Sequence, residues 1–170
     1  TVGRLEPQKN QKLLIDAFSL IADELADYSL VVYGEGSLRE ELEAYIKEKR
    51  LQDRVFLPGA KSNIQDYIKD AALFVLSSDY EGIPNALIEA MAIGLPCVST
   101  DCSPGGAREL IESEENGLIV ECGNPKMLAD AVKRMIVEKK EAKRMGTQAR
   151  LVRSRVDKCK IADSWLGIIH

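Results

Sequence analysis

The sequence predicts an open, doubly wound α/β fold in which helices cover both faces of a parallel sheet of about six strands. Short apolar runs alternate with amphipathic stretches along all 170 residues, which is typical of alternating strands and helices. The apolar runs are continuous, so both faces of each strand are expected to be buried. A composition of 45% apolar and 29% charged residues fits one globular domain with a sizeable core. In such a fold the ligand site lies at the carboxyl ends of the strands.

The expected elements follow one another in a regular order. Strands are predicted at residues 1–2, 30–33, 55–57, 73–76, 96–99 and 118–120. Helices are predicted at residues 10–26, 63–68, 85–93, 127–137, 142–152 and 161–169, and one more begins near Ser37. Ser37 and Glu40 have the spacing of a capping box, and Asn63 is a candidate N-cap for the short helix that follows it.

Charge and composition argue against several classes of function. The net charge of −4 and the aromatic content of 5% argue against a general nucleic-acid binder. No CxxC pair occurs and histidine is found only at His170, so a zinc site is not expected; the cysteines are Cys97, Cys102, Cys122 and Cys159. Reduced thiols, together with the lack of an 18-residue apolar run and of a signal peptide, predict a cytoplasmic location.

Positive charge is concentrated toward the C-terminus. Residues 126–160 contain twelve Lys and Arg against four Asp and Glu, a local charge of +8. Solvated helix faces are one interpretation of this segment. The other is a surface that meets a partner domain or, as a peripheral contact, the anionic inner face of a membrane.

The loop from the first strand to the first helix, residues 3–10, has the chemistry that a phosphate or diphosphate requires. Gly3 provides backbone freedom, Arg4 and Lys9 supply positive charge, and a helix N-terminus follows at Asn10. A solvated loop without a ligand is the alternative.

Two further glycine-containing loops follow predicted strands. Gly34-Glu35-Gly36 resembles the start of a dinucleotide-binding fingerprint, but Arg39 stands where the third glycine would be. The segment 103–106, Ser-Pro-Gly-Gly, could line the same cleft. A tight turn without a ligand explains either loop at least as well.

The segment 77–96 carries the most informative pattern. Residues 81–84, Glu-Gly-Ile-Pro, lead into the predicted helix at 85–93, and Pro84 suits the first helical position. Free N–H groups at this helix N-terminus can receive an anion. The helix is almost wholly apolar and is expected to be buried, so Glu89 needs a donor. That donor is either a protein group, such as a backbone amide or Arg108, or the hydroxyl groups of a ligand.

Other catalytic patterns are missing from the sequence. There is no DxD for a carboxylate-bound metal, no P-loop and no GxSxG elbow, and no internal histidine could act as a general base. No metal is therefore expected, and a bound diphosphate would be neutralised by Arg4, Lys9 and helix dipoles.

Five segments in one order resemble the donor-binding half of a known enzyme family. They are Gly3-Arg4-Leu5 with Lys9-Asn10, Gly34-x-Gly36, Phe56-x-Pro58-Gly59, residues 81–96, and Asn116-Gly117-Leu118. Glu81 and Glu89 have the E-x7-E spacing of retaining glycosyltransferases with the GT-B fold. The chain most resembles family 4 of these enzymes (glycosyl transferases group 1), which includes many bacterial polysaccharide and lipid-linked sugar transferases. The resemblance runs from about residue 2 to residue 137.

The resemblance implies a role for each matching residue. Such enzymes have two Rossmann-like domains with the active site between them, and the C-terminal domain holds a nucleotide-diphosphate sugar. Arg4 and Lys9 would hold the diphosphate, and Glu81 would face the transferred sugar. Glu89 would accept hydrogen bonds from the ribose. The other donor-site residues implied by position are Ala60 and Lys61 beside the base, Gly3 and Gly36 along the cleft, and Gly82, Ile83, Pro84 and Asn85 near sugar and phosphate.

The same resemblance implies the domain organisation and the reaction. Residues 1–170 would be a C-terminal donor domain, with C-terminal helices from about residue 139, and the N-terminal acceptor domain would be missing. A UDP- or GDP-sugar would donate to a saccharide or lipid-linked acceptor with retention and without a metal, and the fragment alone would be inactive. A non-catalytic α/β nucleotide-binding or regulatory module is the alternative. A dinucleotide-dependent oxidoreductase is disfavoured by the incomplete glycine fingerprint.

Overall fold

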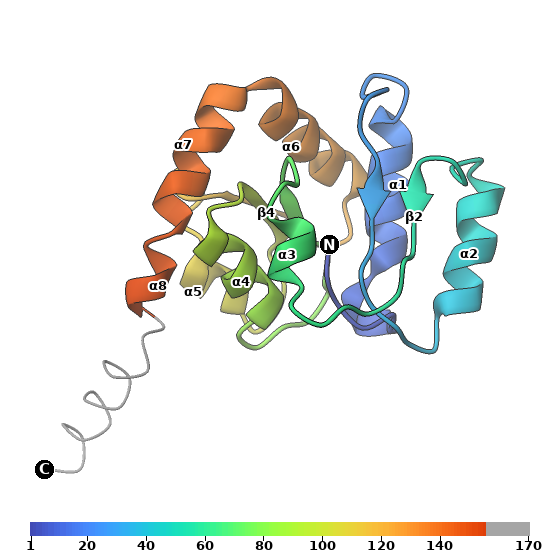
Figure 1. The fold of residues 1–170 in the computed structure, drawn as a ribbon, viewed down its shortest axis with the longest axis horizontal. Coiled ribbons are helices and arrows are strands. Elements are labelled where there is room, and N and C mark those ends of the chain that lie inside the picture. The colour runs from blue at the N-terminus through green and yellow to red at the C-terminus, as the bar shows by residue number, and fades with distance from the viewer. Residues whose placement is uncertain (156–170) are drawn as a thin grey trace, which may run out of the picture.

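Two small parallel sheets form the centre of the protein in a computed structural model that describes residues 1–155 (Figure 1). In one sheet, β1 (Leu30–Val31) pairs with β2 (Val55–Phe56). In the other, β3 (Phe74–Leu76), β4 (Cys97–Thr100) and β5 (Leu118–Val120) are adjacent in that order. The helix predicted at 161–169, and Cys159, Lys160 and His170, lie outside the described residues.

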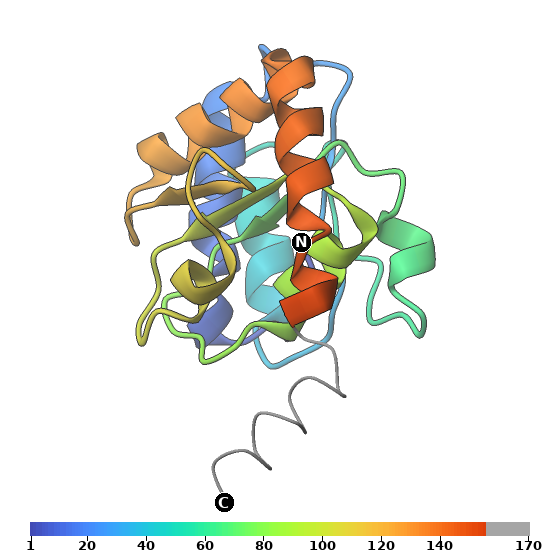
Figure 2. The same cartoon turned by 90° about the vertical axis from the view of Figure 1, so that its left-hand side faces the viewer.

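Helices alternate with these strands and lie on both sides of them, which confirms the predicted α/β class. They are α1 (Gln11–Ile21), α2 (Arg39–Glu48), α3 (Gln65–Ile68), α4 (Asn85–Ile93), α5 (Gly106–Leu110), α6 (Pro125–Val137), α7 (Lys139–Ala149) and α8 (Val152–Arg155), with a short 3-10 helix, η1, at Pro7–Lys9. α1 packs against α6, whereas α3, α7 and α8 contact α4 (Figures 1 and 2). The sequence predicts no helix where α5 forms.

Successive residues of the three-stranded sheet belong to different hydrophobic cores. Val75 of β3 packs into the core of α1 and α6, whereas its neighbours Phe74 and Leu76 pack into the core of α4. β4 repeats the pattern with Val98 on one face and Cys97 on the other. Because successive side chains of a strand point to opposite faces, both faces of this sheet are buried, and this burial explains the continuous apolar runs.

The sixth strand expected at residues 1–2 is only a single bridge between Val2 and Tyr33. The Thr1 backbone nitrogen donates to the Val31 carbonyl at 2.9 Å, and the Gly3 N–H donates to the Tyr33 carbonyl at 2.9 Å. A mainly apolar cavity of about 320 Å³ beside this bridge is lined by Thr1 and by residues of both β1 and β3. The described residues therefore form five strands rather than about six.

Neither of the two predicted helix caps forms. The Ser37 N–H and hydroxyl donate to the carboxylate of Glu6 at 3.1 and 2.9 Å, so α2 begins at Arg39 without a side-chain cap. These bonds lower the pKa of Glu6. Asn63 has a left-handed φ of 53°, and α3 begins two residues later without a side-chain cap. Asn10, by contrast, caps α1 by accepting from the Leu13 N–H at 3.1 Å.

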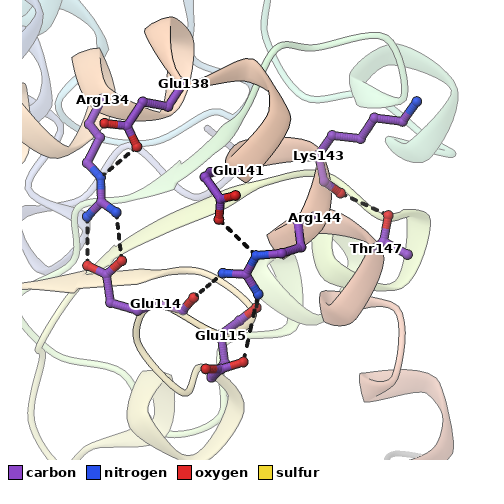
Figure 3. A network of polar contacts seen from close by, with 8 residues as sticks. All are labelled: Glu114, Glu115, Arg134, Glu138, Glu141, Lys143, Arg144 and Thr147. Atoms are coloured by element: carbon purple, nitrogen blue, oxygen red, sulfur yellow. Dashed lines mark hydrogen bonds and ion pairs between the residues drawn. The ribbon is translucent and has the colours of Figure 1, made fainter.

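Ion pairs attach the loop before β5 to α6 and α7 (Figure 3). The Arg134 guanidinium donates to both carboxylate oxygens of Glu114, at 2.7 Å each, and to Glu138 at 3.1 Å. Arg144 donates to the Glu114 carbonyl at 2.6 Å and to the Glu141 carboxylate at 2.8 Å. Arg134 holds the pKa of the Glu114 carboxyl below its usual value. These two cations of the basic segment therefore have partners inside the protein.

Other cations of that segment are exposed on α7. Lys139, Lys140 and Lys143 form no side-chain ion pair with any residue between 1 and 155. In Figure 3 the Lys143 side chain points away from the ion-pair network. Over the described part of the chain, every helix is too short or too polar to cross a membrane.

Candidate functional site

Two loops at the carboxyl ends of strands are joined directly to each other. The loop after β3 begins at Ser77, whose hydroxyl donates to the Lys9 carbonyl at 3.0 Å. The Asp79 N–H donates to the Gln8 carbonyl at 3.0 Å, and the Gln8 side chain donates back to the Tyr80 carbonyl at 2.7 Å. Residues 7–10 and 77–81 therefore hold a fixed arrangement, as expected for groups at one end of a doubly wound sheet.

The centre of this arrangement is a contact between Lys9 and Glu81. The Lys9 ammonium contacts Glu81 Oε1, and the Ser78 hydroxyl donates to the same oxygen at 2.8 Å. Glu81 is only 6% exposed, so its charge requires these partners. The alkyl part of Lys9 lies over Gly3, where a Cβ would come within 3.4 Å of it. The structure thus brings together two residues that the sequence places in separate predicted site segments.

A cavity of about 340 Å³ opens beside the first of these loops. It is lined by Val2, Gly3, Arg4, Tyr33, Gly34, Glu35, Ala60, Lys61 and Ile64. The Arg4 side chain is exposed and pairs with no other residue in the range 1–155, while its carbonyl accepts from Gln11 Nε2 at 2.8 Å. The cavity therefore contains an available guanidinium, and the candidate residues Gly3, Ala60 and Lys61 share it.

Gly34 and Gly36 shape this region by allowing close backbone contact. A Cβ on Gly34 would lie 1.9 Å from the Gly3 carbonyl oxygen, and Gly34 has a φ of +153°. A Cβ on Gly36 would lie 2.4 Å from the Leu5 carbonyl oxygen. Gly36 is outside the cavity lining. It therefore acts through packing of the Gly3–Leu5 backbone.

The turn at residues 81–84 is supported from behind by the segment 103–106. The Glu81 N–H donates to the Ser103 carbonyl at 2.8 Å. A Cβ on Gly106 would lie 1.3 Å from the Gly82 carbonyl oxygen, so only glycine fits there. The segment 103–106, Ser-Pro-Gly-Gly, thus braces the turn instead of lining the cavity described above.

The turn itself is largely open to solvent. Gly82, Ile83 and Asn85 are exposed, and Ile83 retains 68% of its accessible surface. Pro84 is the N-cap of α4, whereas the sequence predicts it as the first helical residue, and its carbonyl accepts from the Leu87 N–H at 3.0 Å. α4 itself spans Asn85–Ile93, as predicted.

Glu89 differs from its predicted environment. The sequence predicts full burial for α4, but Glu89 is half-buried, and only Leu87, Ala90 and Met91 of this helix are buried. Among residues 1–155, Glu89 has no hydrogen-bond or ion-pair partner. Arg108, the proposed protein donor, instead forms a two-pronged contact with Asp101. The Glu89 carboxylate is therefore available to an external donor, although it does not line the cavity beside Arg4.

Three contributors to the site carry weak sequence signals. Ser78 and Ser103 act through contacts with Glu81, and neither serine is assigned a role in its segment by the sequence. Gln11, 3% exposed, reaches back to the Arg4 carbonyl. The one available signal was the glycine pair at 105–106, which marks a close backbone approach.

Comparison with known proteins identifies the family. A sequence model described as "Glycosyl transferases group 1" matches residues 1–152. The chain belongs to the glycosyl transferases group 1 family. This group 1 domain is 38% identical over 162 residues, or 95% of its length, to a Campylobacter jejuni protein. That protein is named N-acetylgalactosamine-N,N'-diacetylbacillosaminyl-diphospho-undecaprenol 4-alpha-N-acetylgalactosaminyltransferase, and the match covers 43% of it.

Solved structures of glycosyltransferases share the fold of this group 1 domain. TarM of S. aureus, solved in a complex that includes UDP, superposes with a TM-score of 0.91 at 30% identity, covering 98% of this chain and 34% of TarM. HepE of Anabaena, in complex with UDP, gives a TM-score of 0.89 at 25% identity, covering 99% of this chain and 48% of HepE. The chain is thus a GT-B glycosyltransferase domain, and it spans less than half of each of these relatives.

Proposed function

We propose that this domain binds the nucleotide-diphosphate sugar of a retaining family 4 glycosyltransferase. The observation that carries the proposal is the joined pair of loops. They place Lys9 against Glu81, next to a cavity that holds the available Arg4. The cations Arg4 and Lys9 suit the anionic diphosphate of such a donor, and the carboxylate of Glu81 suits the hydroxyl groups of its sugar.

The cations are proposed to act on the leaving group. Breaking the bond to the sugar leaves negative charge on the diphosphate. Arg4 and Lys9 can stabilise that charge as it develops, which is the electrostatic form of catalysis. The N-terminus of α4 at Asn85, beside the exposed residues Gly82 and Ile83, would add N–H donors for the diphosphate. Pro84 at the N-cap holds that turn in place.

The carboxylates are proposed to recognise hydroxyl groups. Glu81 would accept from the transferred sugar, and Glu89, which has no partner between residues 1 and 155, would accept from the ribose. Ala60 and Lys61, which line the cavity together with Gly3, would lie beside the base. Gly36 would keep the adjoining backbone in place.

The remaining parts of the reaction rest on the relatives. UDP in the TarM and HepE complexes supports a UDP-sugar donor. The undecaprenol-linked acceptor named for the Campylobacter jejuni relative supports a lipid-linked or saccharide acceptor in bacterial polysaccharide or glycolipid synthesis. The chain spans 43% of that relative, which supports an acceptor-binding domain elsewhere in the protein, without which transfer would not occur. A cytoplasmic location and independence from metal stay predictions.

A thermal-shift screen tests this proposal on the chain itself. A ligand that binds only the folded state raises the melting temperature. We expect UDP or a UDP-sugar to raise it, with EDTA making no difference, and GDP, ADP and NADH to give smaller shifts. A shift with NADH alone would instead favour an oxidoreductase, and no shift with any of them would contradict donor binding by this domain.

Contact with an anionic membrane is a separate proposal, supported by Lys139, Lys140 and Lys143 on α7, which form no ion pair within residues 1–155. Co-sedimentation with vesicles that contain phosphatidylglycerol, compared with phosphatidylcholine alone, tests it. Binding that requires the anionic lipid and is lost when the three lysines are replaced by glutamate supports this contact. Equal behaviour on both vesicles indicates that these lysines are simply solvated.

A further inference from the structure

Ser78, to which the resemblance assigns no role, lies directly behind the carboxylate of Glu81. Its side chain is 1% exposed, and its hydroxyl donates to Glu81 Oε1 at 2.8 Å. Lys9 contacts the same oxygen. One oxygen of the carboxylate therefore receives two donors, one rigid and buried and the other at the end of a flexible chain.

Ser78 is itself held in place by the sheet. It follows β3, and its carbonyl accepts from the Thr100 hydroxyl at 2.6 Å. Thr100, the last residue of β4, is completely buried. The Cys122 thiol approaches the same carbonyl at 3.8 Å. The Ser78 hydroxyl that donates to Glu81 is therefore held in place by the ends of the paired strands β3 and β4.

The second oxygen of Glu81 has a different environment. In the described part of the chain, Oε2 accepts no hydrogen bond, yet it is not among the side-chain oxygens that are both buried and unsatisfied. Oε2 therefore keeps some contact with solvent. A carboxylate held at one oxygen has a defined plane, and its free oxygen points in a defined direction.

We propose that Ser78 is a positioning residue that orients the Glu81 carboxylate so that Oε2 faces the sugar of the donor. The inference rests on the proposed function, since it assumes that Glu81 meets the sugar. Lys9 cannot supply this restraint during binding, because the diphosphate competes for its ammonium. The buried hydroxyl of Ser78 is then the donor that keeps Oε1 in place.

Binding measurements separate positioning from a general structural role. Calorimetric titrations would compare UDP with UDP-N-acetylglucosamine and UDP-glucose for the wild type, Ser78→Ala, Glu81→Ala and the double variant. We expect Ser78→Ala to keep the affinity for UDP within twofold of the wild type. It should weaken the affinity for whichever UDP-sugar the wild type binds more tightly by about threefold to tenfold, the size of one hydrogen bond. In the Glu81→Ala background, Ser78→Ala should change the UDP-sugar affinity by less than twofold.

A matched serine controls for the loss of a buried hydroxyl. Ser99 is completely buried in β4 and donates to the Thr100 carbonyl at 2.9 Å, so Ser99→Ala removes a comparable group away from Glu81. It should leave the preference between UDP and the UDP-sugar unchanged. The proposal is overturned if Ser78→Ala weakens UDP and UDP-sugar equally, or if its effect persists unchanged without Glu81.

Urea unfolding of the same four proteins tests the contact without any nucleotide. Ser78→Ala should lower the unfolding midpoint in the wild type and leave it nearly unchanged in Glu81→Ala. Additive midpoint shifts would show that the two side chains do not interact and would overturn the proposal. A wild type that binds no nucleotide would overturn the proposed function and with it the sugar-facing role, whereas the midpoints would still report on the Ser78–Glu81 contact.

Discussion

Lys9 and Glu81 stand 72 positions apart in the sequence, and the Lys9 ammonium contacts Oε1 of Glu81. The contact joins the loop that leads into α1 to the loop that follows β3. Four further hydrogen-bonded residues, Ser77, Asp79, Gln8 and Asn10, reinforce the same junction. The positive and negative sides of the candidate site are therefore built as one unit.

Removing the ammonium at this junction should weaken binding of a nucleoside diphosphate. A charge-assisted hydrogen bond to phosphate is worth about 1.5–3 kcal/mol, so Lys9→Ala should reduce the affinity for UDP by about tenfold or more. Isothermal titration calorimetry measures this loss. Lys12→Ala is the control, because Lys12 pairs with Glu41 on the surface and is 45% exposed. Equal affinity of Lys9→Ala and the wild type would remove Lys9 from the site.

Glu89 should prove to be a binding residue with little part in stability. Its carboxylate is half-buried and has no partner among residues 1–155, so Glu89→Gln should leave the melting temperature within about 2 °C of the wild type. The same variant should weaken UDP binding several-fold, since an amide is a poorer acceptor for ribose hydroxyls. Differential scanning fluorimetry with and without UDP measures both effects. A collapse of the melting temperature would assign Glu89 a structural role.

Gly106 should tolerate no side chain. A Cβ there would lie 1.3 Å from the Gly82 carbonyl oxygen, so Gly106→Ala must displace backbone and should lower the free energy of unfolding by about 1–3 kcal/mol. The control is Gly82→Ala on the other side of the contact, where a Cβ meets nothing within 4 Å. Urea denaturation of both variants measures the difference. Equal stability of the two would mean that the segment 103–106 does not brace the turn.

The Arg134–Glu114 pair should make a small, pH-dependent contribution to stability. Arg134 lowers the pKa of Glu114 below its ordinary value of 4.5. The stabilisation is therefore present above pH 4.5 and is lost as the pH falls through the lowered value. Because the side chains are 39% and 57% exposed, it should not exceed about 1 kcal/mol.

Urea unfolding at pH 7 and pH 3 tests this sign. The difference in the free energy of unfolding between the wild type and Glu114→Gln should shrink from pH 7 to pH 3. Glu24→Gln, which breaks the surface pair with Lys133, controls for general charge effects. A difference that grows on acidification would contradict the assignment.

Local patterns predict the fold well where local forces decide it. The predicted bounds of α4 hold, with Gly94 in the left-handed conformation that ends a helix, although Pro84 is its N-cap and not its first helical residue. The continuous apolar runs predict strands buried on both faces, as found for β3 and β4, whereas Phe56 of β2 is 44% exposed. The capping box predicted at Ser37 does not form, because the Ser37 hydroxyl donates instead to Glu6, 31 positions away. The sequence around Ser37 gives no sign of this distant partner.

The site residues likewise fall into those that local motifs predict and those that depend on contacts between distant segments. Arg4, Lys9 and Glu81 carry visible motifs, and the structure gathers Lys9 and Glu81 at one junction beside the cavity of Arg4. The roles of Ser78 and of Gly106 depend on contacts across the fold, to Glu81 and to the Gly82 carbonyl. The prediction that Glu89 is fully buried is wrong. α4 is apolar on nearly all sides, so its sequence has too weak an amphipathic pattern to show which face is exposed to solvent.

A crystal structure of this chain with UDP tests the central claim most directly. The account predicts a diphosphate within hydrogen-bond distance of Arg4 and Lys9, the base beside Ala60 and Lys61, and the ribose hydroxyls on Glu89. UDP bound elsewhere, such as in the apolar cavity lined by β1 and β3, with Lys9 still on Glu81, would contradict it.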